Sequence, residues 1–229
     1  MDEPRRAQES PALTALTNVV CLHGFWSHGA GMYLIKRRLE REYGMRARLF
    51  TYRSVRGTLD ENAAMLAAFI HEQGFSSAHI IGHSLGGVVA LRMYATDPDA
   101  VPGRLVCMGS PLSGSRAAEF LSRQDWAEPV FGRSLRPGVV HEAANVWGSH
   151  VCERRDVGII AGNVPLGFGR FVASFDEPND GTVAVAETRL EGARDHLVMD
   201  VSHKGMLVSP DVVDQAAAFL KRGEFLRDD

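Results

Sequence analysis

The chain has 229 residues and a formal net charge of −3, with 45% hydrophobic and 23% charged residues. This length fits one domain, and the composition is that of a globular protein that needs neither metals nor disulfides to fold. The acidic balance provides no basic surface for nucleic acid and no polybasic patch for a membrane, so neither is expected as a partner. We expect a small-molecule substrate, and the composition leaves the oligomeric state open.

Cysteine usage and the start of the chain favour a reduced, cytoplasmic protein. The three cysteines show no pairing framework, because Cys21 and Cys107 lie in apolar strand-like runs and Cys152 lies in a polar stretch. Residues 1–9 are polar, and no stretch approaches the roughly 18 apolar residues of a membrane span. We expect an N-terminal arm over residues 1–16 and one domain over 17–229. A secreted form whose signal has been removed is the alternative.

From Val19 onward, strand-like and helix-like segments alternate. This alternation is typical of an α/β fold with a mostly parallel central sheet flanked by helices. Short apolar runs predict strands, and apolar residues at helical spacing predict helices. The predicted strands cover residues 19–22, 47–52, 78–81, 104–108, 157–161 and 197–201, and the predicted helices cover residues 33–43, 59–70, 88–94, 115–121 and 212–220.

Two helix boundaries carry specific signals. Gly44 is expected to end the helix at 33–43, and Thr58 is the expected N-cap of the next helix, with Glu61 as its capping-box partner. Residues 112–150 are the least regular part of the chain. There we expect either a small cap over one edge of the sheet or a plain surface excursion.

The run GHSLGG at residues 82–87 places Ser84 between glycines, after a predicted strand and before a predicted helix. This arrangement is a nucleophile elbow, in which a Cβ at Gly82 or Gly86 would collide with a neighbouring strand or helix while the serine Oγ is pushed clear of the sheet. A chance match to the motif would be a flexible turn. The strand before it and the helix after it favour Ser84 as a nucleophile.

A serine hydroxyl is a weak nucleophile at neutral pH, so Ser84 needs a histidine base and a carboxylate that orients the histidine. Since parallel strands end at one edge of a sheet, both partners should follow strands. His203 follows the predicted strand at 197–201 and is the expected base. His196 precedes that strand, roughly 17 Å from the edge, and is the alternative if the strand is placed differently. His83 is expected to pack or hydrogen-bond beside the turn.

Asp180 is the expected carboxylate, because it follows the predicted strand at 157–161. It lies in an Asn-Asp-Gly sequence, which taken alone indicates an ordinary turn. The order Ser84, Asp180, His203 along the chain is that of the α/β-hydrolases and favours the catalytic interpretation. Asp176 is the second choice.

An oxyanion hole needs two backbone N–H donors, one of them from the residue after the nucleophile, here Leu85. Leu85 also begins a helix, where unpaired N–H groups and the helix dipole favour an anion. The second donor is expected from Phe25, in the loop after the strand at 19–22, because Gly24 lets the backbone approach a substrate. A turn that merely ends the strand is the alternative for this loop.

Taken together, these segments resemble the lipase-like branch of the α/β-hydrolase superfamily over roughly residues 17–221. The resemblance is carried by LHGFW at 22–26, GHSLGG at 82–87, GSPLSGS at 109–115, NDGTV at 179–183 and SHKGML at 202–207. It implies ester hydrolysis through an acyl-enzyme, with Ser84 as nucleophile, His203 as general base and acid, and Asp180 orienting the histidine. It also implies an oxyanion hole formed by the amides of Phe25 and Leu85.

The aspartate of the Asn-Asp-Gly sequence is similar to that of bacterial triacylglycerol lipases. The chain departs from those lipases because it lacks a signal segment, a cysteine pair, an evident calcium-ligand cluster and a long lid. These departures favour esters with short or medium acyl chains. No cofactor or metal is expected.

Trp26, Leu112 and Met206 are the expected substrate-binding residues, and ordinary core packing is the alternative for each. Phe25, Leu166, Phe168 and Phe171 are further candidates for the pocket wall. The same fold hosts amidases, thioesterases and acyltransferases, and these stay open alongside a non-catalytic binding protein of the same shape.

Overall fold

A computed structural model describes residues 17–25, 27–116, 143–166 and 177–227. Its centre is a six-stranded sheet with the strand order β2-β1-β3-β4-β5-β6, in which every neighbouring pair is parallel. The strands are β1 (Asn18–Leu22), β2 (Arg46–Phe50), β3 (His79–His83), β4 (Leu105–Met108), β5 (Val157–Gly162) and β6 (Asp195–Met199). All six strands therefore end at one edge of the sheet, where a parallel α/β fold gathers its functional loops.

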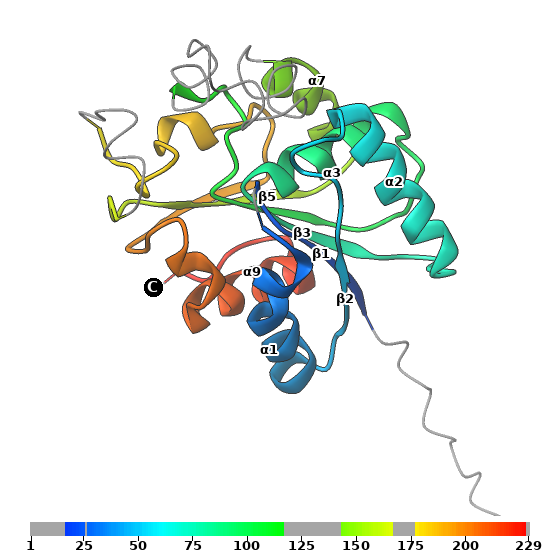
Figure 1. Ribbon diagram of the computed structural model, residues 1–229. Coiled ribbons are helices and arrows are strands. Elements are labelled where there is room, and N and C mark those ends of the chain that lie inside the picture. Colours follow the sequence, from blue (N-terminus) through cyan, green and yellow to red (C-terminus); the bar gives the residue numbers. More distant parts are fainter. Residues whose placement is uncertain (1–16, 26, 117–142, 167–176, 228–229) are drawn as a thin grey trace, which may run out of the picture.

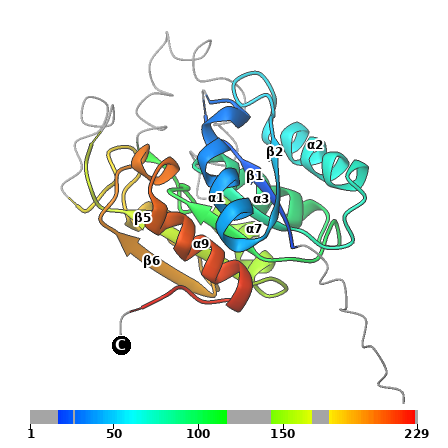
Figure 2. The same ribbon diagram turned by 90° about the horizontal axis from the view of Figure 1, so that it is seen from below.

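Helices cover both faces of this sheet (Figure 1). The helices α2 (Leu59–Glu72), α3 (Leu85–Thr96) and α7 (Ala143–Cys152) lie on one face, and α1 (Tyr33–Tyr43) and α9 (Pro210–Arg222) lie on the other. Figure 2 shows α1 and α9 side by side across the sheet from α2. Short 3-10 turns at Gly29–Met32, Ala186–Thr188 and Gly205–Leu207 complete the fold.

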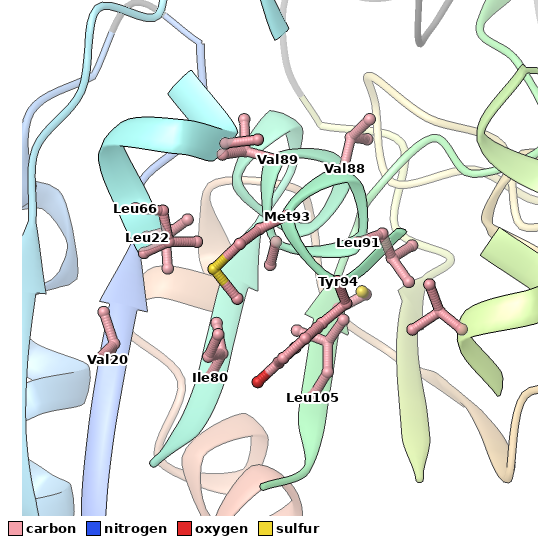
Figure 3. Close-up of a cluster of buried hydrophobic side chains, with 14 of the residues drawn as sticks. Val20, Leu22, Leu66, Ile80, Val88, Val89, Leu91, Met93, Tyr94 and Leu105 are labelled. Carbon is pink, nitrogen blue, oxygen red and sulfur yellow. The ribbon is translucent and has the colours of Figure 1, made fainter. Parts of the chain in front are cut away.

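Successive side chains along each strand point to opposite faces of the sheet, and this divides the core into two layers. On β1, Val20 and Leu22 face the layer under α2, α3 and α7, whereas Val19 and Cys21 face the layer under α1 and α9. All four side chains are fully buried, as expected for a strand covered on both faces. Figure 3 shows the first layer, in which side chains of α3 pack down onto β3 and β4.

The two predicted helix boundaries are confirmed. Helix α1 ends at Gly44, which adopts the left-handed conformation with φ of 64° and donates its N–H to the carbonyl of Leu39. Helix α2 begins with the predicted capping box. The Glu61 N–H donates to the Thr58 hydroxyl at 3.1 Å, and the Thr58 N–H donates to the Glu61 carboxylate at 2.8 Å.

All six predicted strands differ from the structure by one or two residues at one end or both, and two of them end two residues earlier than predicted. The strand predicted at 197–201 is Asp195–Met199, and the strand predicted at 47–52 is Arg46–Phe50. Each strand extends only where its neighbour offers partners, since β6 pairs with β5 from Gly158 to Gly162 and β2 pairs with β1 over its whole length. Pairing, rather than the apolar run, therefore sets these ends.

The irregular region predicted over 112–150 contains part of a helix. Helix α7 packs against α3 and buries Ala144 and Val151, so it belongs to the flanking layer of the sheet. Most of the region, including the helix predicted at 115–121 from residue 117 onward, lies outside the described residues, as does the predicted arm over 1–16. No helix within the described ranges is long and apolar enough to cross a membrane.

Candidate active site

Ser84 lies on the sharp turn between β3 and α3. Its backbone has φ of 54° and ψ of −124°, and it is the only non-glycine residue with positive φ in the described part of the chain. The flanking glycines are sterically required: a Cβ at Gly82 would lie 2.4 Å from the nitrogen of Gly87, and one at Gly86 would lie 2.7 Å from the carbonyl oxygen of His23. The Ser84 hydroxyl does not cap α3. This geometry is the elbow that the sequence predicts.

Asp180 and His203 are in direct contact. The Nδ1–H of His203 donates to Oδ2 of Asp180 at 2.6 Å, and the backbone N–H of His203 donates to the Asp180 carbonyl at 2.8 Å. The other carboxylate oxygen, Oδ1, accepts the N–H groups of Thr182 and Val183 at 2.9 and 2.7 Å. Asp180 is fully buried and His203 nearly so. Because Nδ1 carries the proton, the Nε2 of His203 is left to act as a base.

The end of β4 brings these two residues close to the elbow. The Ser84 N–H donates to the carbonyl of Met108, and a Cβ at the next residue, Gly109, would lie 3.0 Å from both Asp180 Oδ2 and His203 Nδ1. Among the described residues, Ser84 and His203 share no hydrogen bond, so the Asp180–His203 contact is the one link of the predicted triad that is formed. Catalytic hydrogen bonds of this kind often tighten only when substrate binds.

The predicted oxyanion loop approaches the elbow closely. A Cβ at Gly24 would lie 2.9 Å from the Cβ of Ser84, so only glycine allows this approach. The His23 Nδ1–H donates to the Gly24 carbonyl at 2.7 Å. The Phe25 N–H belongs to the same trans peptide and therefore points away from the His23 ring. Leu85 is the first residue of α3, and its N–H is among those without a partner inside the helix.

Tyr52 holds this loop, a role that the sequence did not reveal. Its hydroxyl donates to the His23 carbonyl at 2.7 Å, its N–H donates to His23 Nε2 at 3.4 Å, and its ring stacks on the His23 ring with centroids 4.5 Å apart. Burial lowers the pKa of His23, which keeps the ring neutral and able to accept at Nε2. Tyr52 follows β2, and no local motif connects it with a loop 29 residues earlier.

The alternative candidates have other surroundings. The prediction that His196 precedes the last strand is wrong, because His196 is the second residue of β6. Its Nε2 hydrogen-bonds the Thr188 hydroxyl at 2.9 Å. That hydroxyl donates to the Val185 carbonyl, so His196 is the donor in this bond. His83 is buried and hydrogen-bonded beside the turn, as predicted. Asp176 lies outside the described residues.

The expected substrate-binding residues fall into two groups. Leu112 is completely buried in the layer under α2, α3 and α7, and Met206 is completely buried in the layer under α1 and α9. This burial agrees with core packing, the alternative that the sequence left open for both residues. Their part in binding stays a prediction. Phe25 is partly buried against the first layer and Leu166 is 62% exposed. Trp26, Phe168 and Phe171 lie outside the described residues.

A polar cavity of about 950 Å³ lies at the opposite edge of the sheet, where His79, Arg104 and Asp156 mark the starts of strands. Arg104 is already paired with Asp156 at 3.0 Å, and Arg155 donates to the carbonyls of Pro98 and Gly103. A strand's length, roughly 17 Å, separates this edge from Ser84. Across the described ranges, no group of three or more His, Cys, Asp or Glu side chains is placed to hold a metal ion.

Comparison with known proteins points to one family. The family model described as "Alpha/beta hydrolase family" matches residues 19–224. Lipase LipV of Mycobacterium tuberculosis is 35% identical over 82 residues, which are 34% of this chain and 31% of that protein. The (lyso)-N-acylphosphatidylethanolamine lipase of Bos taurus is 27% identical over 161 residues, 63% of this chain and 46% of that protein. The matches thus span less than half of these relatives.

Among solved structures, the mature form of the Bacillus licheniformis lipase BlEst2 superposes with a TM-score of 0.73 at 19% identity, and the match covers 95% of each chain. At this identity the likeness concerns the fold. It agrees with the parallel sheet and its flanking helices.

Proposed function

The chain belongs to the alpha/beta hydrolase family, and from that premise we propose that it is a serine esterase that cleaves carboxylic esters through Ser84, His203 and Asp180. The single observation that carries the proposal is the 2.6 Å contact between His203 Nδ1 and Asp180 Oδ2, buried at the strand edge that also bears the Ser84 elbow. Serine activation requires a carboxylate that orients a histidine, and here that pair lies at the same strand edge as a partly buried serine on a sharp turn.

In the first half of the proposed reaction, the Nε2 of His203 takes the proton of the Ser84 hydroxyl while Oγ attacks the ester carbonyl carbon. The carbonyl oxygen becomes an oxyanion, which accepts hydrogen bonds from the N–H groups of Phe25 and Leu85. Asp180 stabilises the imidazolium ion that has formed. One such oxyanion donor contributes about 3–4 kcal/mol of transition-state stabilisation.

In the second half, His203 returns its proton to the departing alcohol oxygen and leaves an acyl-enzyme on Ser84. A water molecule then gives a proton to His203 and attacks the acyl carbon, and collapse of this second intermediate releases the acid and restores Ser84. Every transferred proton passes through Nε2 of His203, because the proton on Nδ1 remains on that nitrogen, hydrogen-bonded to Asp180.

We propose esters with short or medium acyl chains as substrates. The names of the relatives, a lipase and an N-acylphosphatidylethanolamine lipase, support ester cleavage without fixing the acyl length.

The proposal is tested by hydrolysis of p-nitrophenyl esters of increasing acyl length, beside matched thioesters and anilides. We expect ester turnover that falls at long acyl chains and is lost in Ser84→Ala. Turnover of thioesters or anilides in preference to all esters would contradict the ester assignment while leaving the nucleophile in place.

The base is tested by a matched pair of histidine variants. We expect His203→Ala to lose activity and His196→Ala to keep it, because His196 donates to Thr188 away from the elbow. The reverse result would assign the base to His196.

A further inference from the structure

His83, the last residue of β3, stands between the elbow and the loop that carries His203. Its side chain is only 5% exposed, and its Nε2 lies 2.9 Å from the backbone carbonyl oxygen of His203. A carbonyl oxygen only accepts, so the Nε2 of His83 must carry the proton and donate it. The hydrogen bond thereby fixes the tautomer of this ring.

Both edges of the His83 ring are enclosed by the site. The His83 and His203 rings are 4.6 Å apart between centroids and tilted by 49°. On the other side, a Cβ at Gly24 would lie 3.1 Å from the Nδ1 of His83, so this nitrogen faces the predicted oxyanion loop. The ring is therefore packed against both loops.

His83 also stays uncharged in this position. Burial, and then the neighbouring His203, lower its pKa to about 3. At neutral pH the ring therefore keeps a single proton, on Nε2, and can hold the His203 carbonyl throughout a reaction. A neutral neighbour also adds no charge repulsion when His203 becomes an imidazolium ion.

Three hydrogen bonds fix His203. Two of them, from its Nδ1–H and its backbone N–H, lead to Asp180 in the loop after β5. The third, from His83 to the His203 carbonyl, leads to β3, the strand that presents Ser84. Asp180 thus holds the His203 ring, whereas the bond from His83 ties the His203 backbone to the strand that presents Ser84.

We propose that His83 is a positioning residue that holds the His203 loop against the elbow and so sets the distance between base and nucleophile. This inference rests on the proposed function of Ser84 and His203. It predicts that loss of the Nε2–H donor lowers kcat with little change in KM, since the bond affects the transfer of the proton and not the binding of the ester.

The test compares His83→Leu, which has no donor, with His83→Gln, whose side-chain amide nitrogen can take the place of Nε2. His79→Leu is the control, because His79 is a partly buried histidine at the opposite end of the same strand, where its Nδ1 accepts the N–H of Arg104. Steady-state kinetics with p-nitrophenyl butyrate are scaled to active sites titrated with a fluorophosphonate, which corrects for misfolded protein.

We expect kcat per active site to fall roughly 10- to 100-fold in His83→Leu, as for a displacement of about 1 Å between reacting groups. His83→Gln should recover most of the loss, and His79→Leu should keep the wild-type kcat. An unchanged kcat in His83→Leu, or an equal fall in His79→Leu, would overturn the inference.

If His83→Leu fails to fold, His83→Gln is compared with His83→Asn, whose amide nitrogen takes the place of Nδ1 and cannot reach the His203 carbonyl. We then expect Gln to be the more active, and equal kcat values would contradict the inference. A wild-type protein that is neither active nor labelled at Ser84 would overturn the proposed function as well. Active wild type beside an unaffected His83 variant would overturn the positioning role alone.

Discussion

The backbone of Ser84 leads to a prediction about stability that is independent of catalysis. Its φ of 54° and ψ of −124° are close to those of the first central residue of a type II′ turn, a position that normally takes glycine. A side chain held there costs about 1–3 kcal/mol of strain. Ser84→Gly should relieve this strain, whereas Ser84→Ala keeps a Cβ and the strain with it.

The expected difference follows from two opposing terms. Relief of strain favours the glycine variant by about 1–3 kcal/mol, and the greater freedom of glycine in the unfolded chain opposes it by about 0.4–1 kcal/mol. Ser84→Gly should therefore be more stable than Ser84→Ala by about 1 kcal/mol, or roughly 2–4 °C in Tm for a chain of this size. Urea and thermal unfolding of both variants measure the difference.

Ser149, in the ordinary helical backbone of α7, provides the control. There Ser149→Gly should be less stable than Ser149→Ala by about 1 kcal/mol, the usual cost of glycine in a helix. A lower stability of Ser84→Gly than of Ser84→Ala, with the same sign as at position 149, would refute the strained elbow.

Three further predictions concern the site and its surroundings. Asp180→Asn should lower kcat by roughly 10⁴-fold, because its amide group would impose the wrong tautomer on His203; an unchanged kcat in the ester assay would exclude the carboxylate role. Tyr52→Phe should cost about 1–3 kcal/mol of stability in urea unfolding and reduce kcat, since the His23 carbonyl loses its hydrogen-bond donor. No change in either quantity would show that the Tyr52 hydroxyl does not hold the predicted oxyanion loop. Burial lowers the pKa of His79 to about 4, below the 6.5 of an unfolded histidine. The contribution of His79 to the free energy of unfolding should therefore be complete above pH 6.5 and fall as the pH drops toward 4. His79→Leu should flatten this decline in stability with pH, and an unaltered slope would contradict the prediction.

Local signals in the sequence predicted much of the fold. Gly44 and the Thr58–Glu61 pair act through bonds to residues a few positions away, so the ends of α1 and α2 could be read directly. The elbow around Ser84 was predictable from its local glycine pattern, although only part of its steric demand is local: Gly82 is crowded by Gly87, whereas Gly86 is crowded by His23, at the end of the neighbouring strand.

Features that depend on distant partners were harder to predict. The start of β6 is set by its pairing with β5, and its half-buried residues show no apolar run at Asp195. Helix α7 buries only a few small and apolar side chains against α3. Its sequence therefore shows no clear helical pattern of apolar residues.

The same limit applied to the site. His203 and Asp180 could be proposed because strand ends share an edge, but the bond from His83 joins residues 120 positions apart. A histidine beside a glycine turn carries no sign of such a partner. We propose its positioning role from a contact that only the folded chain shows.

The most direct test of the central claim is to locate the residue that a fluorophosphonate modifies and to measure how fast it reacts. Peptide mass spectrometry should find the adduct on Ser84 in the wild type and in His196→Ala, no adduct in Ser84→Ala, and much slower labelling in His203→Ala. An adduct on another residue, or labelling of Ser84 at an undiminished rate without His203, would contradict the account.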